Sequence, residues 1–245
     1  MTQDERTKLH KIYFRYYADI QNSEFYTNKG FSKETIRRFN LMDVPNLSND
    51  KDFRSLFPNK GDSFYRNYRY IIPGFNEHGE IDYLMFRRNE NCDLSYKNKQ
   101  SNNYLHKHEY IGDINRGLGK IYNSFNLLES SNDVIFIVES WTDAIAIEEI
   151  GYSSIAMNRV ANANTVLKQL INNYYANAKE KKYIIMCDND MIGQDANKNI
   201  SKTLNMFNLK NGIFNHYPLG IKDPDEWLIA DKRGFSNSLK AMTED

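Results

Sequence analysis

Three acidic clusters in the second half of the chain carry the residue types that phosphate chemistry needs. Each cluster directly follows an apolar run that predicts a buried strand. Carboxylate oxygens are the hard ligands that Mg²⁺ prefers, and a divalent cation stabilises the charge that builds up on phosphoryl oxygens during in-line attack. These residues could therefore support metal-dependent phosphoryl transfer. The clusters contain Glu139 with Asp143, Asp188 with Asp190, and Asp223 with Asp225.

The spacing of the acids favours one shared site. In an open α/β sheet, ligands bind in the crevice outside the carboxyl ends of the strands, and alternate residues such as Asp188 and Asp190 share a face. We expect Asp188, Asp190 and Asp143 to hold one or two Mg²⁺ or Mn²⁺ ions. Glu139 would act beside them as a ligand or proton acceptor, and Lys222 would contact a triphosphate or the template.

A simpler interpretation exists for single acids. Asp190 precedes Met191 and Asp223 precedes Pro224, so either carboxylate could only cap the helix that follows. Three such clusters after three predicted strands are harder to explain as caps alone. The metal site is the better interpretation of the set.

The elements that must position these acids alternate between strand and helix. This alternation predicts a parallel sheet with right-handed crossovers and helices on its faces. The predicted strands cover 134–139, 153–158, 183–188 and 212–217, and the predicted helices cover about 141–150, 163–178 and 193–207, with a short one from Pro224.

The first 130 residues predict a smaller α+β region. A helix is expected from about Asp4 to Ile20, a turn at 25–31, a helix at 32–39, a loop-rich connection at 44–66 and a hairpin at 68–72 and 81–86. We place the domain boundary between residues 130 and 131.

The stretch from the end of the hairpin to residue 120 mixes basic and aromatic residues without a clear period. Such a mixture suits nucleic acid, because cations meet phosphates and bases stack on rings. The candidates are Arg87, Arg88, Lys107 and Lys120. An ordinary solvated loop would have the same composition, so the acidic clusters carry most of the weight.

Composition narrows the class of protein. The 245 residues include 17 Tyr and 14 Phe, which indicates a globular chain. The formal net charge is zero, but residues 1–130 carry a small basic excess and the rest a matching acidic excess. Cys92 and Cys187 are the only cysteines, which excludes a zinc ribbon and a disulfide framework. No stretch is long and apolar enough for a membrane span, so we expect a cytoplasmic protein without a membrane partner.

The motifs resemble the TOPRIM domain, and more specifically the catalytic core of DnaG-type DNA primases of bacteria and phages. Glu139-Ser140-Trp141-Thr142-Asp143-Ala144 is similar to the first TOPRIM motif, and Asp188-Asn189-Asp190 with Gly193 and Ala196 to the second. Lys222-Asp223-Pro224-Asp225-Glu226 resembles the Asp-Pro-Asp element of primases. Upstream, Lys29-Gly30-Phe31 and the hairpin with Arg87 are similar in order to the subdomain that precedes TOPRIM in primases.

The resemblance implies a fold, an activity and partners. The expected fold is α/β, a Rossmann-like TOPRIM parallel sheet with flanking helices, preceded by the smaller α+β subdomain. The expected activity is that of a primase-like nucleotidyltransferase, which makes short primers on single-stranded DNA with Mg²⁺ or Mn²⁺. Single-stranded DNA, nucleoside triphosphates and a replicative helicase or other replication protein are the expected partners, in a phage or mobile-element replication system.

Two departures from the family pattern keep alternatives open. The family usually has Gly after the glutamate, where this chain has Ser140 followed by the bulky Trp141. The family's zinc ribbon is also missing, so we expect template recognition to come from elsewhere. A TOPRIM nuclease using the same metal site, and a non-catalytic nucleic-acid-binding replication protein, are the alternatives.

Overall fold

The computed structural model describes residues 2–17, 23–76, 78–112, 121–129, 131 and 133–244. The chain divides into two compact units, each built from segments that are distant in the sequence. The first draws on 1–24, 36–74 and 81–114, and the second on 25–35, 75–80 and 115–245. The domain boundary between residues 130 and 131 stays a prediction.

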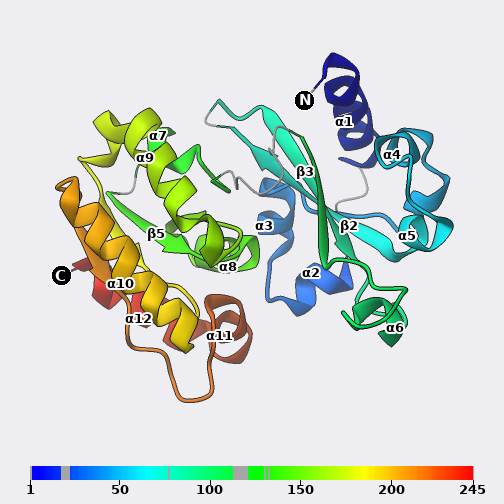
Figure 1. The fold of residues 1–245 in the computed structure, drawn as a ribbon. Helices are drawn as coiled ribbons and strands as arrows, with labels where there is room; N and C mark the ends of the chain where they lie inside the picture. Colours follow the sequence, from blue (N-terminus) through cyan, green and yellow to red (C-terminus); the bar gives the residue numbers. More distant parts are fainter. Residues whose placement is uncertain are drawn as a thin grey trace. The chain divides into compact units, whose positions relative to one another are not determined.

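An antiparallel sheet forms the centre of the first unit (Figure 1). Its strands follow the order β1 (Met42–Asp43), β2 (Tyr68–Phe75), β3 (Ile81–Arg88) and β4 (His108–Gly112). The predicted hairpin is present as β2 and β3. The predicted first helix is α1 (Gln3–Tyr16), which the side chain of Thr2 caps; residues 18–20 of the prediction lie outside the described residues.

The first half is more regular than the sequence indicates. The expected loop at 44–66 contains η2 (Leu47–Asn49), α4 (Lys51–Leu56) and α5 (Asp62–Asn67). Stacked and edge-on contacts among Phe53, Phe57 and Phe64 hold these short helices, so tertiary packing stabilises what local propensity leaves open. The expected turn at 25–31 likewise begins with α2 (Glu24–Asn28), followed by α3 (Lys33–Arg38), and the basic stretch contains α6 (Leu94–Lys97) and β4.

The second unit contains the predicted parallel sheet. Its order is β6 (Ser153–Ala156), β5 (Val134–Val138), β7 (Lys182–Ile185) and β8 (Asn211–Ile213), and all neighbours pair in parallel. The strands end earlier than predicted, because the residues after the last ladder pairs turn away into loops. The remaining elements are α7 (Asn126–Glu129), α8 (Trp141–Glu149), η3 (Val160–Asn162), α9 (Ala163–Ala178), α10 (Met191–Met206), α11 (Pro224–Ala230) and α12 (Lys232–Glu244).

Helices cover the parallel sheet in the way its strand order requires. The step from β5 to β6 runs opposite to the steps from β6 to β7 and from β7 to β8, so right-handed crossovers place α8 on one face and α9 and α10 on the other. An apolar cluster joins alternate residues of the central strands, such as Ile135 and Ile137, to Leu167 and Leu170 of α9 and Ile200 of α10. The sheet is therefore buried, which explains its continuous apolar strands.

A segment from the start of the chain packs within the second unit. Tyr26 meets the ring of Trp141 edge-on, and Lys29 forms an ion pair with Asp225. Gly30 has φ +80°, and a Cβ there would lie 3.1 Å from Leu228. Residues 25–35 thus lie against α8 and α11, and Trp141, only 2% exposed, is a packing residue.

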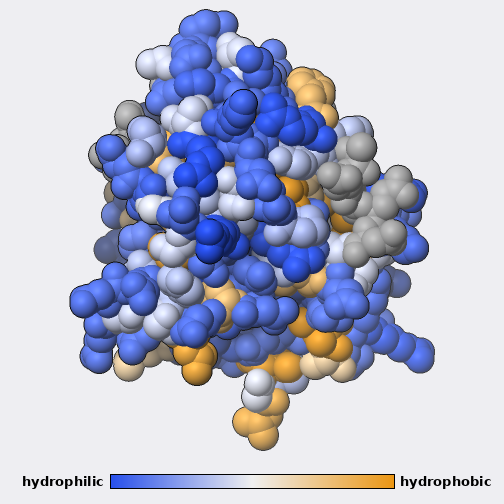
Figure 2. Space-filling model, turned by 90° about the vertical axis from the view of Figure 1, so that its right-hand side faces the viewer, coloured by the Kyte–Doolittle hydropathy of each residue, from blue (hydrophilic) through white to orange (hydrophobic). Residues whose placement is uncertain are grey.

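None of the described helices combines the length and the apolar character that crossing a membrane requires. On the face shown in Figure 2, hydrophobic residues gather in small groups among hydrophilic ones.

Candidate active site

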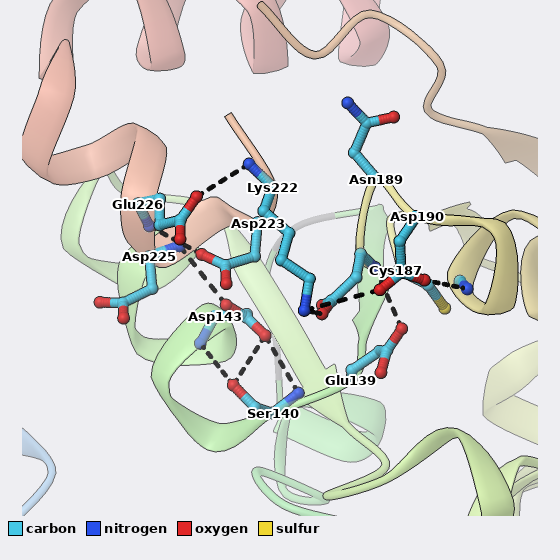
Figure 3. A network of polar contacts seen from close by, with 12 residues as sticks. Glu139, Ser140, Asp143, Cys187, Asn189, Asp190, Lys222, Asp223, Asp225 and Glu226 are labelled. Carbon is cyan, nitrogen blue, oxygen red and sulfur yellow. Dashed lines mark hydrogen bonds and ion pairs between the residues drawn. The ribbon is translucent and has the colours of Figure 1, made fainter. Parts of the chain in front are cut away.

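Glu139 and Asp188 meet at the carboxyl edge of the parallel sheet. They follow β5 and β7, which are hydrogen-bonded neighbours with Ile137 opposite Ile185. The backbone N–H of Asp188 donates to Oε1 of Glu139 over 3.1 Å (Figure 3). The first two predicted acidic clusters therefore lie together, as the strand order requires.

Asp190 is held by the helix that it starts. Its Oδ1 accepts the backbone N–H of Gly193 over 2.9 Å, which caps α10. Its Oδ2 lies 3.6 Å from the ammonium of Lys222. Asp190 can therefore cap α10 through Oδ1 and take part in the acidic site through Oδ2.

Asp143 is buried in the first turn of α8. Its Oδ2 accepts from the backbone N–H and the hydroxyl of Ser140, at 3.1 and 2.7 Å, while Ser140 in turn caps α8. Its Oδ1 lies 3.4 Å from the backbone N–H of Asp225. Ser140 thus fixes the orientation of Asp143.

Lys222 brings a positive charge to the acids. Its Nζ lies 2.7 Å from Oδ2 of Asp188, in addition to its contact with Asp190 (Figure 3). The loop that carries it is fastened by Asn189, whose backbone N–H donates to the carbonyl of Lys222 over 2.6 Å. Sequence reasoning missed Asn189, since the middle residue of Asp-x-Asp carries no signal of its own.

The third cluster divides between two roles. Asp223 caps α11 by accepting the N–H of Glu226 over 2.8 Å. Asp225 is 5% exposed, pairs with Lys29, and turns its carboxylate away from Glu139 (Figure 3). Lys29 lies in the quoted Lys-Gly-Phe segment, but nothing in the sequence links it to an acid so far along the chain.

The electrostatics show how crowded the acids are. Burial, and after it the charge of Asp188, raises the pKa of Glu139 to about 7. Burial, and next the charge of Asp223, raises the pKa of Asp143 well above its ordinary value. Burial is also the main cause that raises the pKa of Asp223 to about 6. In contrast, the N–H of Gly193 lowers the pKa of Asp190, and the hydrogen bond to Asp188 raises the pKa of Lys222.

The donor set suits a hard divalent cation in type, although the acids are not gathered into a finished metal site. Within the described residues, no three His, Cys, Asp or Glu side chains are arranged so that they could hold a metal ion. The ammonium of Lys222 stands instead between Asp188 and Asp190, and so marks where these carboxylates accept positive charge. The residues that fit a cation best are therefore Asp188 and Asp190, with Glu139 beside them.

Of the predicted basic residues, Arg87, Arg88 and Lys107 belong to the first unit. Arg87 is 5% exposed and pairs with Glu90, and Arg88 donates to the carbonyls of Tyr96 and Leu105. Both arginines hold the segment after β3. Lys107 is exposed, and Lys120 lies outside the described residues.

Comparisons with known proteins agree with this geometry. Residues 136–228 match the family described as Toprim-like. The primase of Aquifex aeolicus, in a structure of its zinc-binding and RNA polymerase domains, is 18% identical with a TM-score of 0.69, over 99% of this chain and 60% of that one. A DnaG catalytic core is 15% identical with a TM-score of 0.66, over 97% of this chain and 79% of that one. The primase fragment of the bacteriophage T7 primase-helicase is 14% identical with a TM-score of 0.57, over 88% and 72%.

A search of curated proteins found no match. The chain spans 60% of the Aquifex structure, and all these identities are low, so the likeness establishes the fold. The predicted fold class is confirmed: the chain has the fold of DnaG-type primase catalytic cores, with a Toprim-like domain in its second half.

Proposed function

The chain carries a Toprim-like domain within the fold of a primase catalytic core, and we propose that it is a nucleotidyltransferase that makes short primers on single-stranded DNA. The observation that supports this most is the meeting of Glu139, Asp188 and Asp190 at one sheet edge, with Lys222 among them. Carboxylates held this close repel one another, so a cation is expected to bind there.

The residues have distinct roles in this proposal. Asp188 and Asp190 hold Mg²⁺ or Mn²⁺, with Asp143 supporting them from α8. A divalent cation bound there offsets the charge that develops on the α-phosphate and the departing pyrophosphate. Glu139 accepts the proton of the attacking 3′ hydroxyl. Its Oε1 already accepts the N–H of Asp188, which leaves Oε2 for that proton.

Lys222 and the other predicted basic residues account for the remaining contacts in this proposal. We assign Lys222 and the Asp223 to Asp225 turn to the nucleoside triphosphate, and Lys107 and Lys120 to the template side. Arg87 and Arg88 would support the template side by holding the segment after β3. The structural neighbours include a DnaG catalytic domain bound to single-stranded DNA. Another neighbour contains T7 primase domains bound to an RNA/DNA hybrid. These neighbours support nucleic acid, and by extension a helicase or polymerase, as partners.

Primer synthesis tests the proposal. The protein is incubated with single-stranded DNA, labelled nucleoside triphosphates and Mg²⁺ or Mn²⁺, and the products are resolved by length. We expect the wild type to make short labelled products. The amount of product should fall by about two orders of magnitude in Asp188→Asn, because the metal ion that offsets the developing charge loses one of its ligands.

Asp195→Asn is the matched control. Asp195 is exposed on α10 and contacts only Lys198 among the ion pairs found in the described residues, so this variant should retain full synthesis. A shortened template in place of new products would identify a nuclease. Equal activity in Asp188→Asn and the wild type would refute the site assignment.

A further inference from the structure

Lys222 occupies the position between the two acids of the Asp-x-Asp motif. Of the ion pairs found in the described part of the chain, those of Asp188 and Asp190 both come from its ammonium, at 2.7 and 3.6 Å. Both carboxylates follow β7, two positions apart, and would repel each other without this charge.

The backbone and the side chain of Lys222 are constrained very differently. The backbone is fixed on both sides, since its carbonyl accepts the N–H of Asn189 and its own N–H donates to Glu226 over 2.9 Å. Asn189 also donates its side-chain amide to the carbonyl of Ile221 over 3.2 Å. The side chain is 49% exposed and ends in a flexible four-carbon stem. The ammonium can therefore leave the acids while its loop stays in place.

We propose that the Lys222 ammonium and a divalent cation compete for the Asp188 and Asp190 carboxylates. Without metal, the Lys222 ammonium offsets the charge of the two carboxylates and holds the two side chains close to each other. When a metal ion binds, the ammonium is displaced and becomes available to the phosphates of the incoming nucleotide. This inference rests on the metal dependence in the proposed function and adds a specific role for one residue.

The competition couples metal and nucleotide binding. A phosphate that captures the displaced ammonium removes the competitor of the metal, so nucleotide should tighten metal binding, and metal should tighten nucleotide binding by the same factor. If Lys222 only bound the triphosphate, its substitution would leave the metal affinity unchanged in the absence of nucleotide.

Direct metal binding tests the proposal without requiring activity. Mn²⁺ is titrated into the full chain, with neither nucleotide nor template, and free Mn²⁺ is followed by electron paramagnetic resonance. We expect Lys222→Met to bind Mn²⁺ about fivefold more tightly than the wild type, because two partly exposed ion pairs no longer oppose the metal.

Two control variants separate charge from position. Lys222→Arg keeps the competing charge and should bind Mn²⁺ within about twofold of the wild type. Lys198→Met removes an exposed lysine that pairs with Asp195 on α10, and should also match the wild type. Folding is checked by thermal unfolding in EDTA, where Lys222→Met should melt lower than the wild type. In Mn²⁺ without EDTA, the Tm of Lys222→Met should rise by more than that of the wild type.

The outcomes distinguish this inference from the proposed function. Equal or weaker Mn²⁺ binding by Lys222→Met would overturn the competition, even if primer synthesis proves metal-dependent. Absence of Mn²⁺ binding to every variant would overturn it as well. Tighter binding by Lys222→Met alone would establish it, whether the same site makes primers or cuts DNA.

Discussion

Gly193 sets how closely the first turn of α10 approaches the strand-end acids. A Cβ at this position would lie 2.1 Å from the carbonyl oxygen of Asp188, which is a backbone atom and cannot move aside without moving its own side chain. The glycine of the Asp-x-Asp-x-x-Gly pattern is therefore required because no side chain fits at this position. Its N–H donates to Asp190, which caps α10.

We expect Gly193→Ala to lower the free energy of unfolding by about 1–3 kcal/mol, because the added methyl group forces a backbone shift. It should also weaken Mn²⁺ binding, since Asp188 and Asp190 move with that backbone. Urea denaturation and the Mn²⁺ titration measure the two effects. Gly212→Ala is the control, because nothing lies within 4 Å of a Cβ there; equal stability of both variants would contradict the steric argument.

At the scale of elements, the sequence predicts the strands of the parallel sheet and the acids that follow them, but not the short helices of the first unit. Buried parallel strands leave uninterrupted apolar runs, so β5 and β7 and the acids at their ends could be read directly. The short helices α4 and α5 could not, because the aromatic contacts that hold them join residues from separate helices and from β3. The contact of Lys222 with Asp188 and Asp190 could not be predicted either, because it depends on the hydrogen bond by which Asn189 holds the loop that carries Lys222.

The attachment of α1 to α4 gives a pH-dependent prediction. Asp50 has a fully buried carboxylate that pairs with Arg15 and accepts from the hydroxyl of Tyr16. Burial raises the pKa of Asp50, but the N–H of Phe53 and the contacts with Arg15 and Tyr16 outweigh it and lower the pKa overall. A lowered folded-state pKa stabilises the protein above the unfolded value of about 4, and this contribution is lost as the pH falls below it.

Asp50→Asn keeps the cap on α4 but removes the charge. At pH 7 it should reduce stability by about 1 kcal/mol, which corresponds to a fall in Tm of about 2–4 °C. The difference from the wild type should shrink as the pH falls below about 4. Calorimetry across this range measures it, with the exposed Asp62→Asn as control. A gap in Tm that stays constant with pH would refute the role of the charge.

At the scale of the whole molecule, the second compact unit includes a segment that the sequence order hides. Residues 25–35 precede residue 131 by about a hundred positions, yet they belong to the second unit. Within it, Lys29 pairs with the buried Asp225, and Ser32 donates its N–H and hydroxyl to Glu149 over 2.9 Å each. Long-range pairs of this kind leave no local pattern, so strand and helix periodicity alone does not assign residues 25–35 to the second compact unit.

A fragment of residues 131–245 should therefore fold poorly by itself. Without residues 25–35, Trp141 loses its contact with Tyr26, and Asp225 loses Lys29 while it stays buried. We expect the fragment to melt well below the full chain and to bind a hydrophobic dye. In the full chain, Lys29→Met should lower stability by about 1–3 kcal/mol through the same carboxylate, whereas Lys33→Met, on the exposed side of α3, should change it by less than about 0.5 kcal/mol. A fragment that melts cooperatively at the temperature of the full chain would show instead that residues 131–245 form an independent domain.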